Sequence, residues 1–178
     1  YEMQRSLVGS EMCIRDRADT GRLDQVSRGV YTLPEVWEDE FVSIQERYKR
    51  GVFALDTALF LHDLTDRTPH KFHMAFPYGY NTSSPKAAGI LCSCKKEPYY
   101  SLGIALVDTP AGNTVRAYNA EKTLCEILKP ISHTDIQIIT DAFKRYAGRK
   151  DKNIPLLSEY AHQLRVEKRL RPYLEVLL

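Results

Sequence analysis

The sequence predicts an α+β protein, in which a short β-hairpin is followed by a mixed α+β region and then by a helical bundle. Three observations predict this class. Two short apolar-containing runs meet at a glycine near residue 29, strand-like and helix-like segments alternate through residue 118, and helical patterns alone occupy residues 119–178. The 178 residues suit one ordinary domain or two small ones, and the 43% of hydrophobic residues support a buried core.

The first element is the hairpin, formed by residues 23–27 and 30–33. Gly29 supplies the positive φ that a tight connection requires, and Pro34 ends the second strand. A helix follows, because four large apolar side chains recur on one stripe: Trp37, Phe41, Ile44 and Tyr48. Acidic residues crowd its start and basic residues its end, which complements the helix dipole, and Gly51 is expected to act as the C-cap.

The central region predicts a short helix and four strands. Asp56 is placed to cap the short helix, which continues through residue 61. Strand patterns cover residues 71–76, 90–95, 102–108 and 114–118. Residues 109–113 contain proline and glycine and are expected to form a hairpin loop between the last two strands.

From residue 119 onward, three helices begin at residues that cap helix N-termini: Asn119, Ser132 and Asn153. The first is expected to stop before Pro130 and the second at Gly148. A fourth helix begins near residue 165, and the proline within its pattern is expected to kink or restart it.

Residues 1–17, YEMQRSLVGSEMCIRDR, differ from the rest of the chain. They lack the apolar run of a signal peptide and carry three acidic and three basic residues. The stretch SLVGSEMCIRDR resembles the translation of a transposase sequencing adapter. We therefore expect residues 1–17 to be an adapter-derived artefact and exclude them from the fold prediction.

Charge is distributed unevenly along the chain. The net charge is only +2, but residues 141–178 hold nine Lys and Arg against five Asp and Glu. This basic segment predicts either solvated helix faces or contacts with phosphates or an acidic protein. The candidate contact residues are the following: Asp66, Arg67, Lys144, Arg145, Arg149 and Lys150. Asp66 could equally close a turn before the proline at residue 69.

Motifs for catalysis or cofactor binding are lacking. The sequence contains neither a glycine-rich phosphate loop nor a nucleophile elbow nor a paired-histidine zinc motif. Cys92 and Cys94 lie two residues apart on a predicted strand, but we expect buried, inert thiols rather than a metal site. His62 is interpreted as a structural histidine. We expect no enzyme activity, no cofactor and no metal, and the short apolar runs predict a cytoplasmic protein without a membrane segment.

Five segments resemble abortive-infection antitoxins of the AbiEi type. Residues 21–34 (GRLDQVSRGVYTLP) resemble the wing of their winged helix-turn-helix. The remaining similar segments are residues 53–69 (FALDTALFLHDLTDRTP), 76–81 (FPYGYN), 140–147 (TDAFKRYA) and 173–178 (YLEVLL). The resemblance implies a remnant wing at residues 18–34 and an antitoxin domain at residues 35–178. That domain divides into a mixed α+β part, residues 35–118, and a helical part, residues 119–178.

The resemblance implies a function in two parts. Such antitoxins belong to type IV toxin–antitoxin pairs, are not known as enzymes, and repress their own promoter through the winged helix. Their C-terminal domain counters a nucleotidyltransferase toxin without requiring a stable complex. The implied DNA-binding residues of this chain are Arg22, Ser27, Arg28 and Tyr31. The recognition helix of the family would precede the wing, where the adapter-like peptide stands.

Two other functional classes fit the residues. The centre and the helical part could form a protein-interaction module without a DNA role, in which the basic C-terminal segment faces an acidic partner. An enzyme acting on nucleic acid would have to use Asp56, Asp66 and Lys71, whose spacing matches no catalytic motif. The antitoxin reading is the main prediction, and the interaction module is its alternative.

Overall fold

The computed structural model describes residues 24–27, 30–32 and 39–177 of the chain. Residues 1–17, Gly29, Pro34 and Trp37 lie outside the described residues, so the expectations for them stay predictions. Within the described part, the protein has the α+β class that the sequence predicts.

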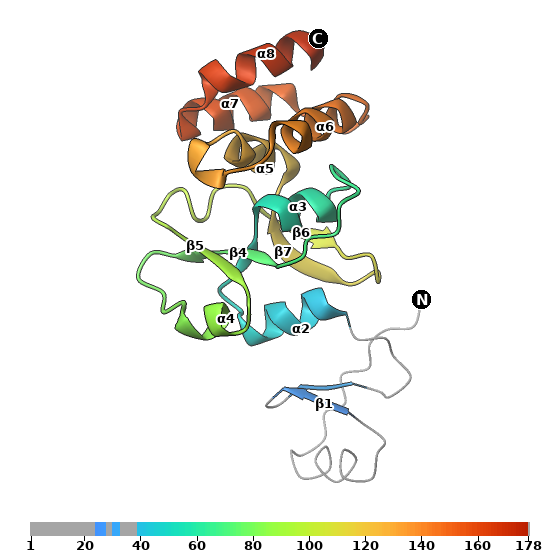
Figure 1. Ribbon diagram of the computed structural model, residues 1–178, viewed down its shortest axis with the longest axis vertical. Helices are drawn as coiled ribbons and strands as arrows, with labels where there is room; N and C mark the ends of the chain where they lie inside the picture. The colour runs from blue at the N-terminus through green and yellow to red at the C-terminus, as the bar shows by residue number, and fades with distance from the viewer. Residues whose placement is uncertain (1–23, 28–29, 33–38, 178) are drawn as a thin grey trace.

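The predicted hairpin is present as a separate two-stranded sheet. Strand β1, Asp24–Ser27, pairs antiparallel with β2, Val30–Thr32, and the register shifts between Gln25 and Ser27. Its identity as a wing stays a prediction. In Figure 1 the hairpin lies beyond α2, Glu40–Arg47, at the end of the molecule opposite the C-terminal helices.

A five-stranded mixed sheet forms the centre, in the strand order β5-β4-β3-β7-β6. Its strands, in chain order, are β3 Val52–Phe53, β4 His73–Pro77, β5 Leu91–Lys95, β6 Ile104–Asp108 and β7 Thr114–Tyr118. The parallel pairs are β4 with β5 and β3 with β7, and the other two pairs are antiparallel. The sequence did not predict β3, because a strand of two fully buried residues has no alternating pattern.

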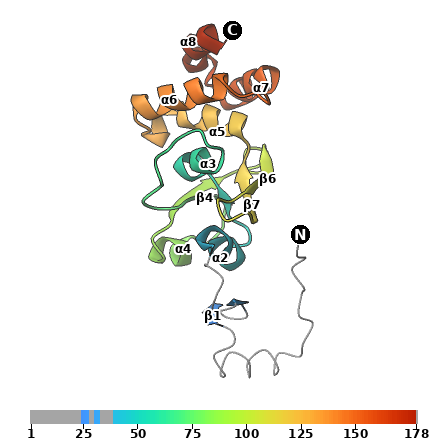
Figure 2. The same ribbon diagram turned by 90° about the vertical axis from the view of Figure 1, so that its right-hand side faces the viewer.

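Helices cover both sides of the sheet (Figures 1 and 2). On one side α2 and the short α4, Ser83–Ala87, pack over an apolar cluster that includes Phe53, Met74 and Phe76. On the other side α3, Leu55–Leu61, lies between the sheet and the C-terminal helices and contacts both. Asp56 was expected to cap α3, but the helix begins one residue earlier and Asp56 lies in its first turn.

The C-terminal part is the predicted helical bundle. It contains α5 Ala120–Ile127, the 3-10 helix η1 Pro130–Ser132, α6 Ile136–Ala147, α7 Ile154–Leu164 and α8 Glu167–Leu177. Asn119 and Asn153 cap α5 and α7 as predicted, and Gly148 ends α6. The predicted cap at Ser132 is wrong, because Asp135 accepts from the Gln137 amide at 2.7 Å. Helix α8 continues through Pro172.

None of the helices in the described ranges is both long and apolar enough to cross a membrane.

Two main clusters of buried side chains stabilise the fold, one within the helical bundle and one between α2 and the sheet. Helix α5 lies where the sheet and the bundle meet, and all eight of its residues are buried.

Candidate functional site

The predicted DNA-contact residues fall on or beside the β1–β2 hairpin. Tyr31 pairs with Gln25 across the two strands, and Ser27 pairs with Val30 next to the connection. Arg22 and Arg28 lie outside the described residues. The structure therefore brings Ser27 and Tyr31 into one ribbon.

The predicted partner-contact residues gather between the end of α3 and α6. The Asp66 carboxylate lies 3.3 Å from Arg145 Nη2, and both side chains are exposed. The Arg67 amide donates to Thr65 Oγ1 at 3.2 Å, so the side chain that accepts in this turn is Thr65, whereas the expectation had assigned that role to Asp66. Lys144 and Lys150 are exposed. An exposed ion pair of this kind contributes little to stability, which leaves these charges accessible to a partner.

Arg149 is used within the fold. Its Nη1 donates to the backbone carbonyl of His62 at 2.7 Å, and its other two nitrogens bind Asp151 at 2.9 and 2.6 Å. The Arg149 guanidinium lowers the pKa of Asp151 to about 2 by hydrogen bonding to its carboxylate. His62 is the structural histidine that the sequence predicts, because its Nε2 lies 2.7 Å from the Tyr118 carbonyl.

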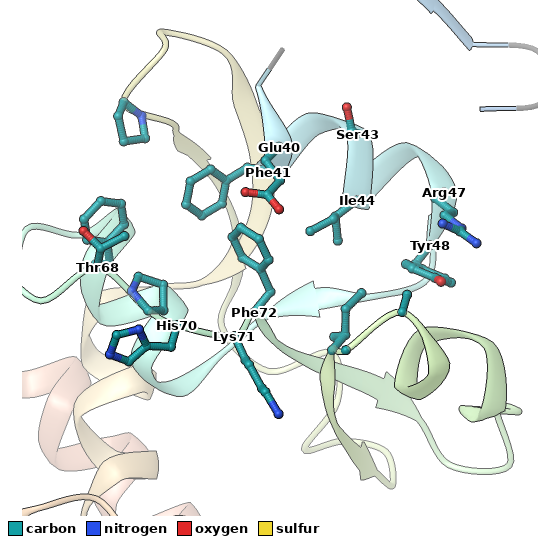
Figure 3. A pocket seen from close by; sticks show the side chains of 16 residues that line it. Glu40, Phe41, Ser43, Ile44, Arg47, Tyr48, Thr68, His70, Lys71 and Phe72 are labelled. Atoms are coloured by element: carbon teal, nitrogen blue, oxygen red, sulfur yellow. The ribbon is translucent and has the colours of Figure 1, made fainter. Parts of the chain in front are cut away.

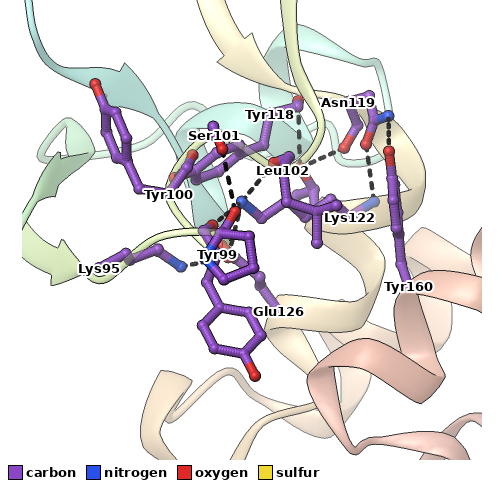
Figure 4. Close-up of polar contacts among 12 residues, drawn as sticks. Lys95, Tyr99, Tyr100, Ser101, Leu102, Tyr118, Asn119, Lys122, Glu126 and Tyr160 are labelled. Carbon is purple, nitrogen blue, oxygen red and sulfur yellow. Dashed lines mark hydrogen bonds and ion pairs between the residues drawn. The ribbon is translucent and has the colours of Figure 1, made fainter.

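Sequence reasoning missed a buried polar cluster centred on Lys122 (Figure 4). The Lys122 side chain is fully buried, and its Nζ donates to the carbonyls of Tyr99 and Leu102, both at 2.6 Å. The same nitrogen lies 3.2 Å from the centre of the Tyr118 ring and 3.8 Å from Glu126 Oε1. An ammonium group between two carbonyls and an aromatic face is well placed to be stabilised there.

Glu126 is shared by two lysines, because Lys95 from β5 also pairs with its Oε1. Burial lowers the pKa of Lys122 to about 7, while the neighbouring Glu126 carboxylate acts in the opposite direction.

Three buried side-chain atoms of the described chain have no hydrogen-bond partner: His73 Nδ1, Ser93 Oγ and Glu126 Oε2. Ser93 and Lys95 share one face of β5 because side chains two apart in a strand point to the same side.

The Lys122 cluster positions a loop. Lys122 and Tyr118 come from α5 and the end of β7, whereas the carbonyls that they bind belong to residues 99, 100 and 102, between β5 and β6. The only sequence signal for this role was the i,i+4 spacing of Lys122 and Glu126, which also fits an exposed helix face. The cluster can therefore hold residues 96–103 in one conformation.

A cavity of about 560 Å³ lies between α2, residues 68–72 and residues 88–90 (Figure 3). Phe41, Ile44 and Phe72 supply apolar walls, while Arg47 and Lys71 contribute basic groups. Of the three residues considered for a nucleic-acid enzyme, Lys71 lines this cavity, whereas Asp56 and Asp66 do not. The structure thus does not assemble that catalytic set around the cavity.

The cysteines do not form a metal site in the part of the chain that the structure describes. There, no group of three or more His, Cys, Asp or Glu side chains is arranged to hold a metal ion. Cys125 is buried, and burial raises the pKa of its thiol to about 12. The expectation of buried thiols is wrong for Cys94, which is exposed at an edge strand, while Cys92 is half-buried.

The chain matches no protein-family model, and it matches no curated protein. It is similar to the crystal structure of the RV2827C protein from Mycobacterium tuberculosis, with a TM-score of 0.52 and 14% sequence identity. The similarity covers 92% of this chain and 68% of that chain. At this identity the likeness shows a shared fold, namely an α+β protein in which a mixed sheet carries a helical C-terminal bundle.

Proposed function

We propose that this protein is the cytoplasmic antitoxin of a type IV toxin–antitoxin system and a DNA-binding repressor of its own promoter. The observation that supports the proposal best is the β1–β2 hairpin. It forms a sheet of its own at the residues where the resemblance to AbiEi-type antitoxins places the wing, and an α+β part with a helical bundle follows it.

The proposed roles follow from the chemistry of a two-stranded ribbon. Arg28, which lies between the two strands in the sequence, and Arg22, which precedes them, would bind phosphates. Ser27 and Tyr31 would add hydrogen bonds to the backbone of the duplex. Such contacts position the protein, whereas base recognition belongs to a helix in the major groove. The partners of the protein are then its promoter DNA and, functionally, a nucleotidyltransferase toxin.

The test is a titration of promoter DNA with the antitoxin as its genomic locus encodes it, followed by fluorescence anisotropy at several salt concentrations. We expect Arg28→Ala to weaken binding and to lower the slope of log K against log salt by about one, the value for one lost phosphate contact. Arg171→Ala, an exposed change on α8, is the matched control. An unchanged slope in Arg28→Ala would contradict the role of the wing.

The second candidate function is a protein-interaction module without DNA binding. It is favoured by two exposed apolar side chains in the helical part that also carries Lys144 and Arg145, since Ile131 is 82% and Ile136 64% exposed. In cells arrested by the neighbouring toxin, a Lys144→Glu/Arg145→Glu variant would then lose rescue, while Arg28→Ala would keep it. Rescue by the charge-reversed variant would exclude this surface as the site of antitoxicity.

A further inference from the structure

A second concentration of basic and aromatic side chains lies far from the hairpin in sequence. We define the tyrosine–cation surface by Arg50, Tyr78, Tyr80 and Lys96. Tyr78 and Lys96 follow the carboxyl ends of β4 and β5, and Arg50 precedes β3. Carboxyl ends of parallel strands are where ligands commonly bind in sheets that carry helices on both faces.

The register of the parallel strands places the first pair side by side. Pro77 is opposite Lys95, and the Tyr78 amide donates to the Lys95 carbonyl at 2.8 Å. As a result, Lys96 Nζ lies 4.8 Å from the centre of the Tyr78 ring. The first cation and the first ring of the surface are therefore in direct contact.

The second pair repeats this arrangement. The Arg50 guanidinium lies 6.0 Å from the centre of the Tyr80 ring. Tyr80 in turn stacks on the buried Phe76, with ring centres 4.6 Å apart and an angle of 10° between the ring planes. The buried ring thus fixes the orientation of Tyr80.

The two pairs are tied together by Tyr100. Its hydroxyl donates to the Arg50 carbonyl at 2.6 Å, and its amide donates to the Lys96 carbonyl at 3.1 Å. Tyr118 Oη donates to the Tyr100 carbonyl at 3.0 Å, which connects this surface to the Lys122 cluster beneath it (Figure 4). The surface is consequently preorganised by the interior of the protein.

Tyr78 remains 70% exposed despite its cation partner. Glu97 Oε2 accepts from Ser101 and Glu46 pairs with Lys49, and within the part of the chain that the structure describes no ion pair joins a carboxylate to Arg50 or Lys96. An exposed ring offers a face for stacking, and a cation beside each ring is placed for a phosphate. An exposed ring together with neighbouring cations is the combination that binds the bases and phosphates of a single strand.

From this arrangement we propose that the tyrosine–cation surface binds single-stranded nucleic acid. A base stacks on Tyr78, while Arg50 and Lys96 neutralise neighbouring phosphates. The surface reads no sequence, because stacking and phosphate contacts do not distinguish bases. This activity is separate from the binding of duplex DNA by the hairpin and does not depend on it.

The experiment measures binding of a fluorescein-labelled oligouridylate, about 12 nucleotides long, to the full chain by fluorescence anisotropy. We expect Tyr78→Ala to weaken binding about tenfold, and Tyr78→Phe to retain it because the ring face remains. Arg50→Ala/Lys96→Ala should lower the salt slope by about 1.4, or about 0.7 for each phosphate contact. Lys168→Ala/Arg171→Ala on α8 removes one exposed lysine and one exposed arginine elsewhere and should leave binding unchanged.

Four results would overturn the proposal, and the first three concern the tyrosine–cation surface itself. They are the absence of oligouridylate binding, binding that Tyr78→Ala leaves intact, and displacement by an oligoglutamate peptide as efficient as displacement by oligouridylate. The last result would assign the surface to an acidic protein. Arg28→Ala distinguishes this proposal from the DNA-binding function, since it should weaken promoter binding and leave oligouridylate binding unchanged. Loss of oligouridylate binding in Arg28→Ala would assign the single strand to the hairpin instead.

Discussion

At the scale of single residues, Lys122 does most to connect the parts of the molecule. Its Nζ joins α5 to the carbonyls of Tyr99 and Leu102. Gly103 makes this close approach possible, because its φ is +67° and a Cβ there would lie 3.1 Å from the Lys122 Cβ. A side chain at residue 103 would therefore strain the backbone and push against Lys122.

The pH dependence of stability tests the state of Lys122. Its pKa in the folded protein is lowered from 10.5 to about 7, so the folded state holds fewer protons than the unfolded state between these values. The free energy of unfolding should therefore rise with pH in this range, by no more than about 1.4 kcal/mol per pH unit.

We expect the free energy of unfolding, measured with urea between about pH 7 and 8.5, to rise more steeply with pH for the wild type than for Lys122→Met. This interval lies below the range in which thiols ionise. The comparison between the two proteins removes contributions from other titrating groups. Parallel stability curves would show that Lys122 stays charged over the whole interval.

At the scale of elements, α3 is attached to both the sheet and the bundle at its C-terminal end. His62 Nε2 contacts the Tyr118 carbonyl on β7, and the His62 carbonyl accepts from Arg149 after α6. Leu59 and Leu64 bury their side chains in the cluster of the helical bundle. The end of α3 thus receives polar contacts from both the sheet and the bundle, and apolar contacts from the bundle.

Acidification should weaken this attachment. Burial lowers the pKa of His62 below the ordinary value of 6.5, so the unfolded chain takes up a proton at a pH where the folded protein does not. The contribution of neutral His62 to the free energy of unfolding is fully present above pH 6.5, and it is lost as the pH falls below that value.

We expect thermal unfolding of His62→Gln to depend less on pH than that of the wild type between about pH 7 and 5.5. His73 shares the lowered pKa and remains in both proteins, so the difference reports His62 alone. An equal dependence in the two proteins would contradict a neutral, half-buried His62.

At the scale of the whole molecule, the arrangement is one of layers, with α5 as the shared layer. The sheet lies on one side of α5 and the other C-terminal helices lie on the opposite side (Figure 2). All eight residues of α5 are buried, including Glu121, Lys122 and Glu126. Glu121 accepts from the Tyr146 hydroxyl at 2.8 Å, and Lys122 and Glu126 face the loop and β5. Each buried charge of α5 therefore has a partner from a different element.

The sequence by itself determined the α+β class, four of the five central strands and three of the helix boundaries. These features are local, because Asn119 and Asn153 cap their helices with their own side chains and Gly148 ends α6 within one turn. The start of α6 was misjudged because Ser132 and Asp135 both offer capping oxygens, and the hydroxyl of Ser132 donates to Ile127 and Lys129 instead.

Only the tertiary structure decided what the polar residues of α5 and the glycine at residue 51 do. Lys122 and Glu126 have the spacing of a solvated helix face, and their burial follows from the sheet and loop that residues 52–118 place over them. Gly51 was expected to cap a helix, but Tyr48 takes that position, and a Cβ at residue 51 would lie 2.4 Å from Met74 Cε. In each case the deciding neighbour is far away in sequence, so no local pattern could reveal it.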